Sequence, residues 1–230
     1  MIHERDADCA ALYERQRVEL IGLIRSLSVD QLRTPVPATP AWSVRDVMAH
    51  VVGITADLNA QDFGSGDPDE WTAAQVRSRS TRSVDELAAE WERESSRFED
   101  GLRAFGYEMG SHFLADLLEH GQDVRSALGL ERLADDDTLA VALDHYLDTF
   151  HLALGAAGAS VVVRVVNDEW TLGSGPVVAR LTAGRFDAFR CLGGRRSAAQ
   201  VRALDWTGNV VAVLPFVSPY GLPAEDLVDP

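Results

Sequence analysis

Apolar residues in the first two thirds of the chain recur at the three- and four-residue spacing that is typical of amphipathic helices. Three prolines between residues 34 and 42 prevent a helix there. The pattern predicts a short helix at about 70–79 and five longer ones, at about residues 5–27, 43–59, 83–105, 110–128 and 137–154. We therefore expect a helical bundle at the start of the chain.

The pattern changes after about residue 155, where β-branched residues replace the helical spacing. Strands are predicted at 160–167, 169–173, 177–181 and 209–214, with helices at 183–192 and 197–204. The expected fold class is α+β. Its parts are a bundle of four to five helices over residues 1–156 and a smaller α/β domain over residues 157–230.

Composition narrows the possible partners. The chain has 230 residues and a formal net charge of −15, and all 21 basic residues are arginine. Nucleic acids and anionic membranes need a basic surface, so neither is expected as a partner. Cys9 and Cys191 lie far apart in no motif, which argues against a disulfide framework. The charged start and the lack of a long apolar run predict a soluble, cytoplasmic protein.

Three polar residues fall among the predicted core positions. Asp116 and His120 are four residues apart, so they share one face of a helix. His50 lies on the apolar face of the predicted helix at 43–59. Buried polar groups need partners, and a divalent metal bound by all three would supply one. The alternative is a buried Asp116–His120 hydrogen bond, with His50 an ordinary core histidine.

Residues around this pair have weaker assignments. Asp123 lies three positions after His120 and either orients its ring or makes a surface contact. Glu119 is expected to point into solvent. His112 is a ligand, a wall of the site or a surface residue. His145 and His151 are expected to be structural, and the pattern identifies no general base.

A second candidate site lies near the end of the chain. Arg195 and Arg196 follow two glycines and precede a predicted helix. Paired guanidinium groups at a helix N-terminus can bind a carboxylate or a phosphate. The alternative is two solvated loop arginines in an acidic protein.

Several of these stretches resemble a known family. The segment Trp42–His50 and the later Asp116–Gly129 are similar to the DinB-like metalloprotein superfamily, and more narrowly to the mycothiol-dependent maleylpyruvate isomerase family. Three strings near residues 170–176, 193–197 and 206–208 resemble the C-terminal pattern of that family. The resemblance implies a DinB-like bundle followed by a smaller α/β domain.

The resemblance also implies a chemistry. It assigns the metal ligands to His50, Asp116 and His120, the metal to zinc and the thiol cosubstrate to mycothiol. The expected reaction is isomerisation or S-transfer on a small electrophile, with Arg195 or Arg196 holding a carboxylate. The isomerase has glutamate where this chain has Asp116. Since aspartate is one methylene shorter, a metal must lie closer to that helix or be bound through water.

Two other functions stay open. One is a metal-dependent hydrolase in which bound water is the nucleophile, and the other is a non-catalytic module that binds a metal or a small molecule. Imidazole and carboxylate also suit nickel, iron or manganese. The oligomeric state is open between monomer and homodimer.

Overall fold

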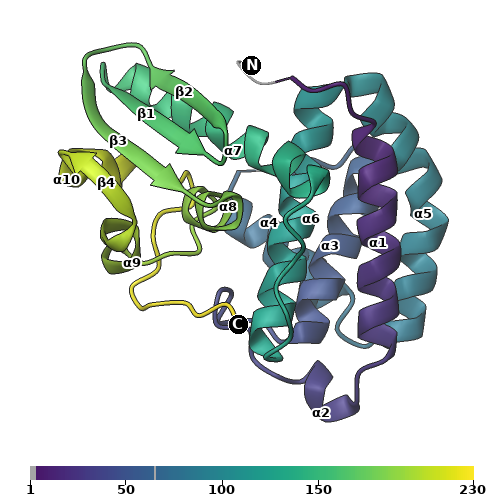
Figure 1. Ribbon diagram of the computed structural model, residues 1–230. Helices are drawn as coiled ribbons and strands as arrows, with labels where there is room; N and C mark the ends of the chain where they lie inside the picture. The colour runs from purple at the N-terminus through teal and green to yellow at the C-terminus, as the bar shows by residue number, and fades with distance from the viewer. Residues whose placement is uncertain (1–3, 65) are drawn as a thin grey trace. The chain divides into compact units, whose positions relative to one another are not determined.

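The protein is described by a computed structural model that covers residues 4–64 and 66–230 (Figure 1). It is α+β, with a helical N-terminal region and a small C-terminal sheet, as the sequence predicts. Chain contacts divide it into two compact units. The helical unit comprises Asp8–Arg132 with Asp229–Pro230, and the sheet unit comprises Leu133–Val228 with the described residues before Asp8.

Six helices lie in the described residues of the helical unit. They are α1 (Cys9–Arg25), α2 (Val29–Leu32), α3 (Val44–Asn59), α4 (Pro68–Ser78), α5 (Val84–Phe105) and α6 (Tyr107–Ala127). The four long ones, α1, α3, α5 and α6, pack side by side in Figure 1. Their inward faces carry the apolar residues that the helical spacing predicts, and this burial holds the bundle together.

Local sequence sets where the key helices begin and end. Ser43 and Asp46 form a capping box at the start of α3, in which each side chain accepts a hydrogen bond from the other's backbone N–H. Ser83 and Glu86 do the same for α5. Gly106, with φ of +83°, separates α5 from α6 because glycine adopts this left-handed backbone without strain. The short helix α2, which the apolar spacing does not predict, begins with a further capping box.

Two glycines allow helices to approach closely. A Cβ at Gly53 of α3 would lie 2.5 Å from the Cβ of Gln75 in α4. A Cβ at Gly110 of α6 would lie 2.5 Å from the Cβ of Cys9 in α1. Since Cβ atoms do not come so close, a larger residue at either position would push the two helices apart.

An ion pair lies inside the helical unit. The guanidinium of Arg17 in α1 donates to the carboxylate of Glu99 in α5, with 3.0 Å between Nε and Oε1. Both side chains are more than nine-tenths buried. Burial raises the pKa of Glu99, although the charge of Arg17 opposes this. Each of the two buried charged groups therefore depends on the other as its hydrogen-bond and ion-pair partner.

Tyr13 is buried in the same unit and supports a prediction about pH. Its hydroxyl lies 3.2 Å from Oγ1 of Thr55, and burial raises its pKa above the ordinary value. In alkaline titration followed by phenolate absorbance, we expect Tyr13 to ionise only as the protein unfolds. Because the folded pKa is the higher one, this stabilisation is present below the unfolded pKa and is lost as the pH rises. Normal ionisation of all four tyrosines in the folded protein would contradict this assignment, and Tyr13→Phe should remove the delayed step.

The sheet unit is built on α7 (Asp137–Ala156). Four strands, β1 (Ser160–Val165), β2 (Asp168–Gly173), β3 (Val177–Ala183) and β4 (Asp205–Gly208), form a sheet in the order β2-β1-β3-β4. β1 is parallel to β3, and the other two pairs are antiparallel. Helices α8 (Arg185–Leu192), α9 (Ala198–Ala203) and α10 (Val210–Val213) and the 3-10 turn η1 (Leu214–Phe216) complete the unit.

Two contacts attach short segments to the units. Near the start of the chain, Nε and Nη2 of Arg5 donate to the carboxylate of Asp144 in α7, at 2.6 and 3.1 Å. Near its end, Asp229 accepts a hydrogen bond from the hydroxyl of Ser126 in α6. The first contact lies within the sheet unit and the second within the helical unit.

The last predicted strand, at 209–214, is wrong. The fourth strand is Asp205–Gly208, and the residues after it form α10 and η1. Gly208 turns the chain with φ of +90°, and the side chain of Asn209 caps α10 by accepting from the N–H of Ala212. These two residues outweigh the strand preference of the valines that follow. The domain limits of 1–156 and 157–230 stay a prediction, although α7 belongs with the sheet by its contacts.

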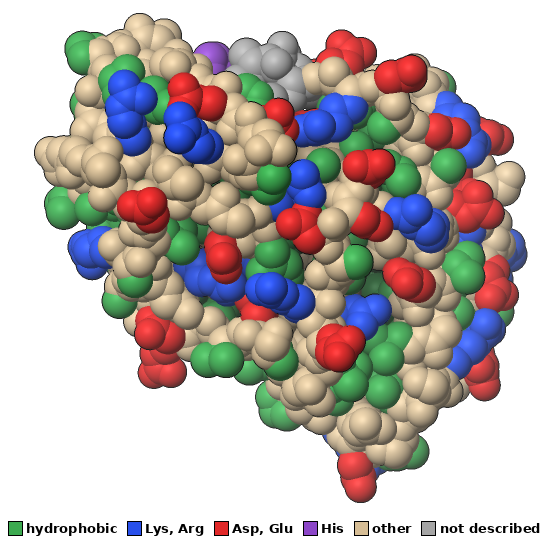
Figure 2. Space-filling view, in the orientation of Figure 1, with side chains coloured by type: hydrophobic (Ala, Val, Ile, Leu, Met, Phe, Trp, Pro, Cys, Tyr) green, Lys and Arg blue, Asp and Glu red, His purple; other side chains and the backbone are tan. Residues whose placement is uncertain are grey.

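The face shown in Figure 2 carries arginine and acidic side chains in alternation. The exposed ion pairs of the described residues include Arg164 with Glu169 in the sheet and Arg25 with Glu92 between α1 and α5. Exposed pairs of this kind contribute little to stability. Within residues 4–64 and 66–230, none of the helices combines the length and the apolar character needed to cross a membrane.

Candidate metal centre

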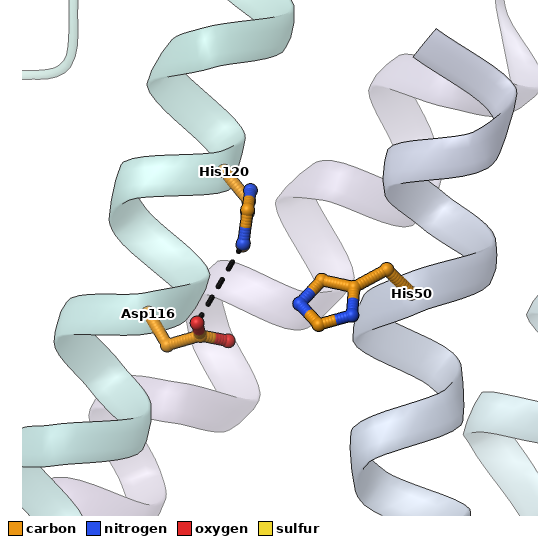
Figure 3. Close-up of side chains that lie close together, drawn as sticks. All are labelled: His50, Asp116 and His120. Carbon is orange, nitrogen blue, oxygen red and sulfur yellow. Dashed lines mark ion pairs between the residues drawn. The ribbon is translucent and has the colours of Figure 1, made fainter. Parts of the chain in front are cut away.

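The structure brings His50, Asp116 and His120 together. His50 projects from α3, and the other two project from the facing side of α6 (Figure 3). Each residue offers one ligand atom, and the three atoms lie within 4.8 Å of one another. Only 3% of His50 and 6% of His120 is exposed, so both imidazoles lie in the interior. The three polar residues that the sequence places among predicted core positions therefore lie together in the structure, on two helices.

The donor set suits a divalent metal. Nε2 of His120 lies 3.6 Å from Oδ1 of Asp116. Two ligands of a tetrahedral zinc ion at about 2.1 Å are themselves separated by about 3.4 Å, so this pair needs almost no movement. The Asp116 side chain is 31% exposed, which leaves the cluster accessible from its side. A direct Asp116–His120 hydrogen bond would require a shorter distance.

Each histidine has an oxygen beside its other ring nitrogen. Nδ1 of His50 lies 2.8 Å from Oε1 of Gln75 in α4. Nδ1 of His120 lies 3.6 Å from Oδ2 of Asp123, whose side chain is fully buried. An acceptor at Nδ1 favours a proton there and the lone pair on Nε2, which is the arrangement that metal-binding histidines use. The 3.6 Å between Nδ1 of His120 and Oδ2 of Asp123 is longer than a hydrogen bond, so the orienting role of Asp123 stays a prediction.

Trp42 packs against both imidazoles. Its ring centroid lies 4.8 Å from that of His50 and 6.1 Å from that of His120, and the two imidazole centroids are 4.8 Å apart. Trp42 precedes the capping residue of α3, so the turn before the helix places this indole against the cluster. The indole limits the rotation of both rings and shields them on one side.

One of the two neighbouring residues, Glu119, differs from the expectation. Glu119, predicted to point into solvent, is only 2% exposed, and that prediction is wrong. Its position on α6 lies within the long buried stretch of that helix, which is wider than a single apolar stripe. His112 is half-buried and stacks on Phe113, with ring centroids 4.9 Å apart. Burial lowers the pKa of His112, while the charge of Asp116 raises it.

Two histidines of α7 make contacts within the sheet unit, and His145 packs its ring against Tyr146 with centroids 5.3 Å apart. His151 of α7 accepts a hydrogen bond at Nδ1 from the N–H of Gly173, at 3.0 Å. This bond joins α7 to the end of β2 within the sheet unit.

Arg195 and Arg196 lie in the sheet unit, between α8 and α9. Nη1 of Arg195 donates to the carbonyl of Gly193 at 3.0 Å, and Nη1 of Arg196 donates to the carbonyl of Arg195 at 2.9 Å. Nη2 of Arg196 also lies 3.8 Å from Asp187. Local contacts of this kind hold the two guanidinium groups in place. Their assignment to an anion site stays a prediction.

Gln75, Asp57 and Trp42 are the residues of this region that the spacing argument did not identify. Trp42 stood in the motif itself, next to the start of the helix. The sequence does not indicate that Gln75 belongs to the site, because a single glutamine in a polar helix is common. Its burial follows from the close approach of α4 to Gly53, which periodicity alone does not reveal.

Comparison with known proteins bears on this cluster. Residues 13–125 match the family described as the mycothiol maleylpyruvate isomerase N-terminal domain. This range includes α3 and the ligand-bearing part of α6. The likeness to that family is thus carried by residues 13–125.

Solved structures show the same fold. The chain is similar to the crystal structure of a mycothiol-dependent maleylpyruvate isomerase, with 14% identity and a TM-score of 0.51 over 81% of this chain and 88% of that chain. A mutant of a mycothiol-dependent maleylpyruvate isomerase matches over the same shares, with 13% identity and a TM-score of 0.49. No curated protein matches the sequence. At this identity the likeness concerns the fold alone.

Proposed function

We propose, from the family of residues 13–125, that the protein is a metal-dependent enzyme that uses mycothiol as its thiol cosubstrate. The reaction we propose is isomerisation of, or S-transfer to, a small electrophile that can carry a carboxylate. The observation that carries the proposal is the cluster of three ligand atoms within 4.8 Å of one another, inside the domain that matches the family. The cytoplasmic location predicted from the sequence is part of the proposal, since thiols are kept reduced there.

The residues have the following proposed roles. His50 and His120 bind zinc through Nε2, and Asp116 binds it through a carboxylate oxygen. Zinc with an open position lowers the pKa of a bound thiol or water, so a nucleophile forms at neutral pH. Asp123 orients the ring of His120. Arg195 and Arg196 are assigned to carboxylate groups of the substrate or cosubstrate.

Asp116 in place of the family's glutamate is compatible with this proposal. The 3.6 Å between its Oδ1 and Nε2 of His120 supports direct binding by the shorter side chain. A larger separation would have required a bridging water. The shorter side chain also leaves more room on the exposed side of the cluster, where a thiol and an electrophile would have to enter.

The test is metal content followed by thiol binding. The protein is purified without chelators and its zinc, nickel, iron and manganese are measured by mass spectrometry, with one equivalent of one metal expected. Titration of mycothiol into the zinc-loaded protein in a calorimeter should then release heat with saturation. Metal-free protein that also fails to take up Zn²⁺ would overturn the proposal.

The same experiment separates the other two functions. Zinc-loaded protein that ignores mycothiol but turns over an ester or an amide would be a hydrolase that uses bound water. Protein that holds zinc with no exchangeable position and binds neither thiol nor ester would be a non-catalytic module. Methyl-mycothiol, which lacks the thiol proton, is the matched ligand control, and we expect it to bind more weakly.

A further inference from the structure

The contact at Nδ1 of His50 extends beyond Gln75. Nε2 of the Gln75 side chain lies 2.9 Å from Oδ2 of Asp57, which follows His50 by about two turns on α3. Gln75 is 2% exposed and Asp57 is half-buried. The three side chains therefore form a chain of hydrogen bonds that runs from the cluster to the edge of the helical unit.

Asp57 determines which way the Gln75 amide points. An ionised carboxylate can only accept hydrogen bonds, so the group that faces it must be a donor. The NH₂ of Gln75 is that donor, and the carbonyl oxygen consequently faces His50. The orientation of the amide therefore follows from hydrogen-bond chemistry.

The carbonyl oxygen in turn determines the tautomer of His50. It can only accept, so Nδ1 of His50 must carry the proton at 2.8 Å. In a neutral imidazole the lone pair then resides on Nε2. With an apolar residue in place of Gln75, either nitrogen could carry the proton, and a proton on Nε2 would compete with a metal.

The position of Gln75 is itself fixed by packing. Gly53 lies one turn after His50 on α3, and its lack of a side chain admits Cβ and Cγ of Gln75. Four residues after Gln75, Arg79 donates to the carboxylate of the buried Glu90 in α5, with 2.9 Å between Nη2 and Oε1. These contacts hold α4 against α3 and α5, so the Gln75 side chain has little freedom to turn away.

We infer that Gln75 and Asp57 form a positioning relay that holds His50 in the Nδ1–H tautomer and so presents Nε2 to the metal. The inference rests on the proposed function for its metal. The tautomer itself is a property of the metal-free protein, and it can be measured without activity. Gln75 touches neither metal nor substrate in this scheme, and acts through His50.

The test reads the tautomer directly. Two-bond ¹H–¹⁵N correlation spectra of the metal-free protein distinguish protonated from unprotonated ring nitrogens, and the His50→Asn spectrum identifies the His50 signals. Wild type should show the proton on Nδ1. Gln75→Leu should show a mixture of tautomers and bind Zn²⁺ about 10- to 100-fold more weakly in competition with a chromophoric chelator.

A paired substitution provides the rescue. In Gln75→Glu with Asp57→Asn, the carboxylate accepts from Nδ1 of His50 and the new amide donates to the carboxylate. This variant should restore both the Nδ1–H tautomer and the Zn²⁺ affinity. Thr72→Ala is the matched control on α4, because it removes a polar group one turn away whose hydroxyl donates to the backbone carbonyl of Asp69, and it should change neither readout.

The outcomes separate the two claims. A wild-type proton on Nε2 of His50, or Gln75→Leu with unchanged tautomer and affinity, would overturn the relay while leaving the metal site standing. Nδ1–H in wild type together with failure to bind Zn²⁺ would overturn the proposed function. Loss of affinity in Gln75→Leu without rescue by the pair would mean that Gln75 acts by packing alone, which also overturns the relay.

Discussion

Replacing His120 by alanine is expected to lower the affinity for Zn²⁺ by more than about 100-fold, because loss of a ligand must exceed the 10- to 100-fold effect of losing a residue that merely orients one. His120 supplies a nitrogen 3.6 Å from Asp116, and without it only two of the three ligands remain. The affinity is measured by chelator competition. Mycothiol binding in the calorimeter should disappear with the metal.

His112→Ala is the matched control for this change. His112 lies two turns before His120 on the same helix, and its replacement also removes one imidazole. It is not part of the cluster, so we expect zinc affinity within error of wild type. Equal losses in the two variants would show that the effect comes from the helix and not from the ligand. Zinc retained at full affinity without His120 would contradict the assignment of the site.

Replacing Arg17 by leucine is expected to lower the free energy of unfolding at pH 7 by about 3–5 kcal/mol, because it leaves a carboxylate buried without its counter-charge. Both side chains of the Arg17–Glu99 pair are more than nine-tenths buried. Urea unfolding followed by circular dichroism measures the difference. The double variant Arg17→Leu/Glu99→Leu should recover most of the loss, since two apolar residues can replace a buried ion pair at little net cost.

The pH dependence of this loss has a definite sign. Burial already raises the pKa of Glu99 in the folded protein, and removing Arg17 raises it further. A raised folded pKa gives stability that is present below the unfolded pKa and is lost as the pH rises through the folded pKa. The gap between Arg17→Leu and the double variant should therefore shrink as the pH falls below neutrality. A gap that is constant with pH would show that charge is not its origin.

Helix positions and the metal cluster could be predicted because both depend on spacing along one element. Asp116 and His120 share a face by helical geometry alone, and His50 was linked to them as another polar residue on an apolar face. The spacing of residues along one helix does not show which other helices pack against it. The approach of α4 at Gly53 decides that Gln75 is buried, and that approach depends on which helices become neighbours.

Two errors have a common cause. Glu119 was assigned to solvent because it lies off the apolar stripe, yet it is buried. The strand at 209–214 was predicted from its valines, yet Gly208 and Asn209 start a helix there. In both cases the local sequence favours one structure, but the surrounding residues determine another. A stripe on a helix marks one buried face, but it does not exclude a second.

The ends of the chain cross between the two units, and this affects how the protein can be made. Arg5, near the start, binds Asp144 of the sheet unit, whereas Asp229 binds Ser126 of the helical unit. The contact between Ser126 and Asp229 therefore forms only after the chain of 103 residues from one to the other has been made, and the contact of Arg5 forms only after α7 has been made. Cutting the gene between residues 132 and 133 would give two fragments. Each fragment would lack a terminal contact residue, Arg5 or Asp229, that the other fragment carries. Co-expression of the two fragments is thus the way to recover both units.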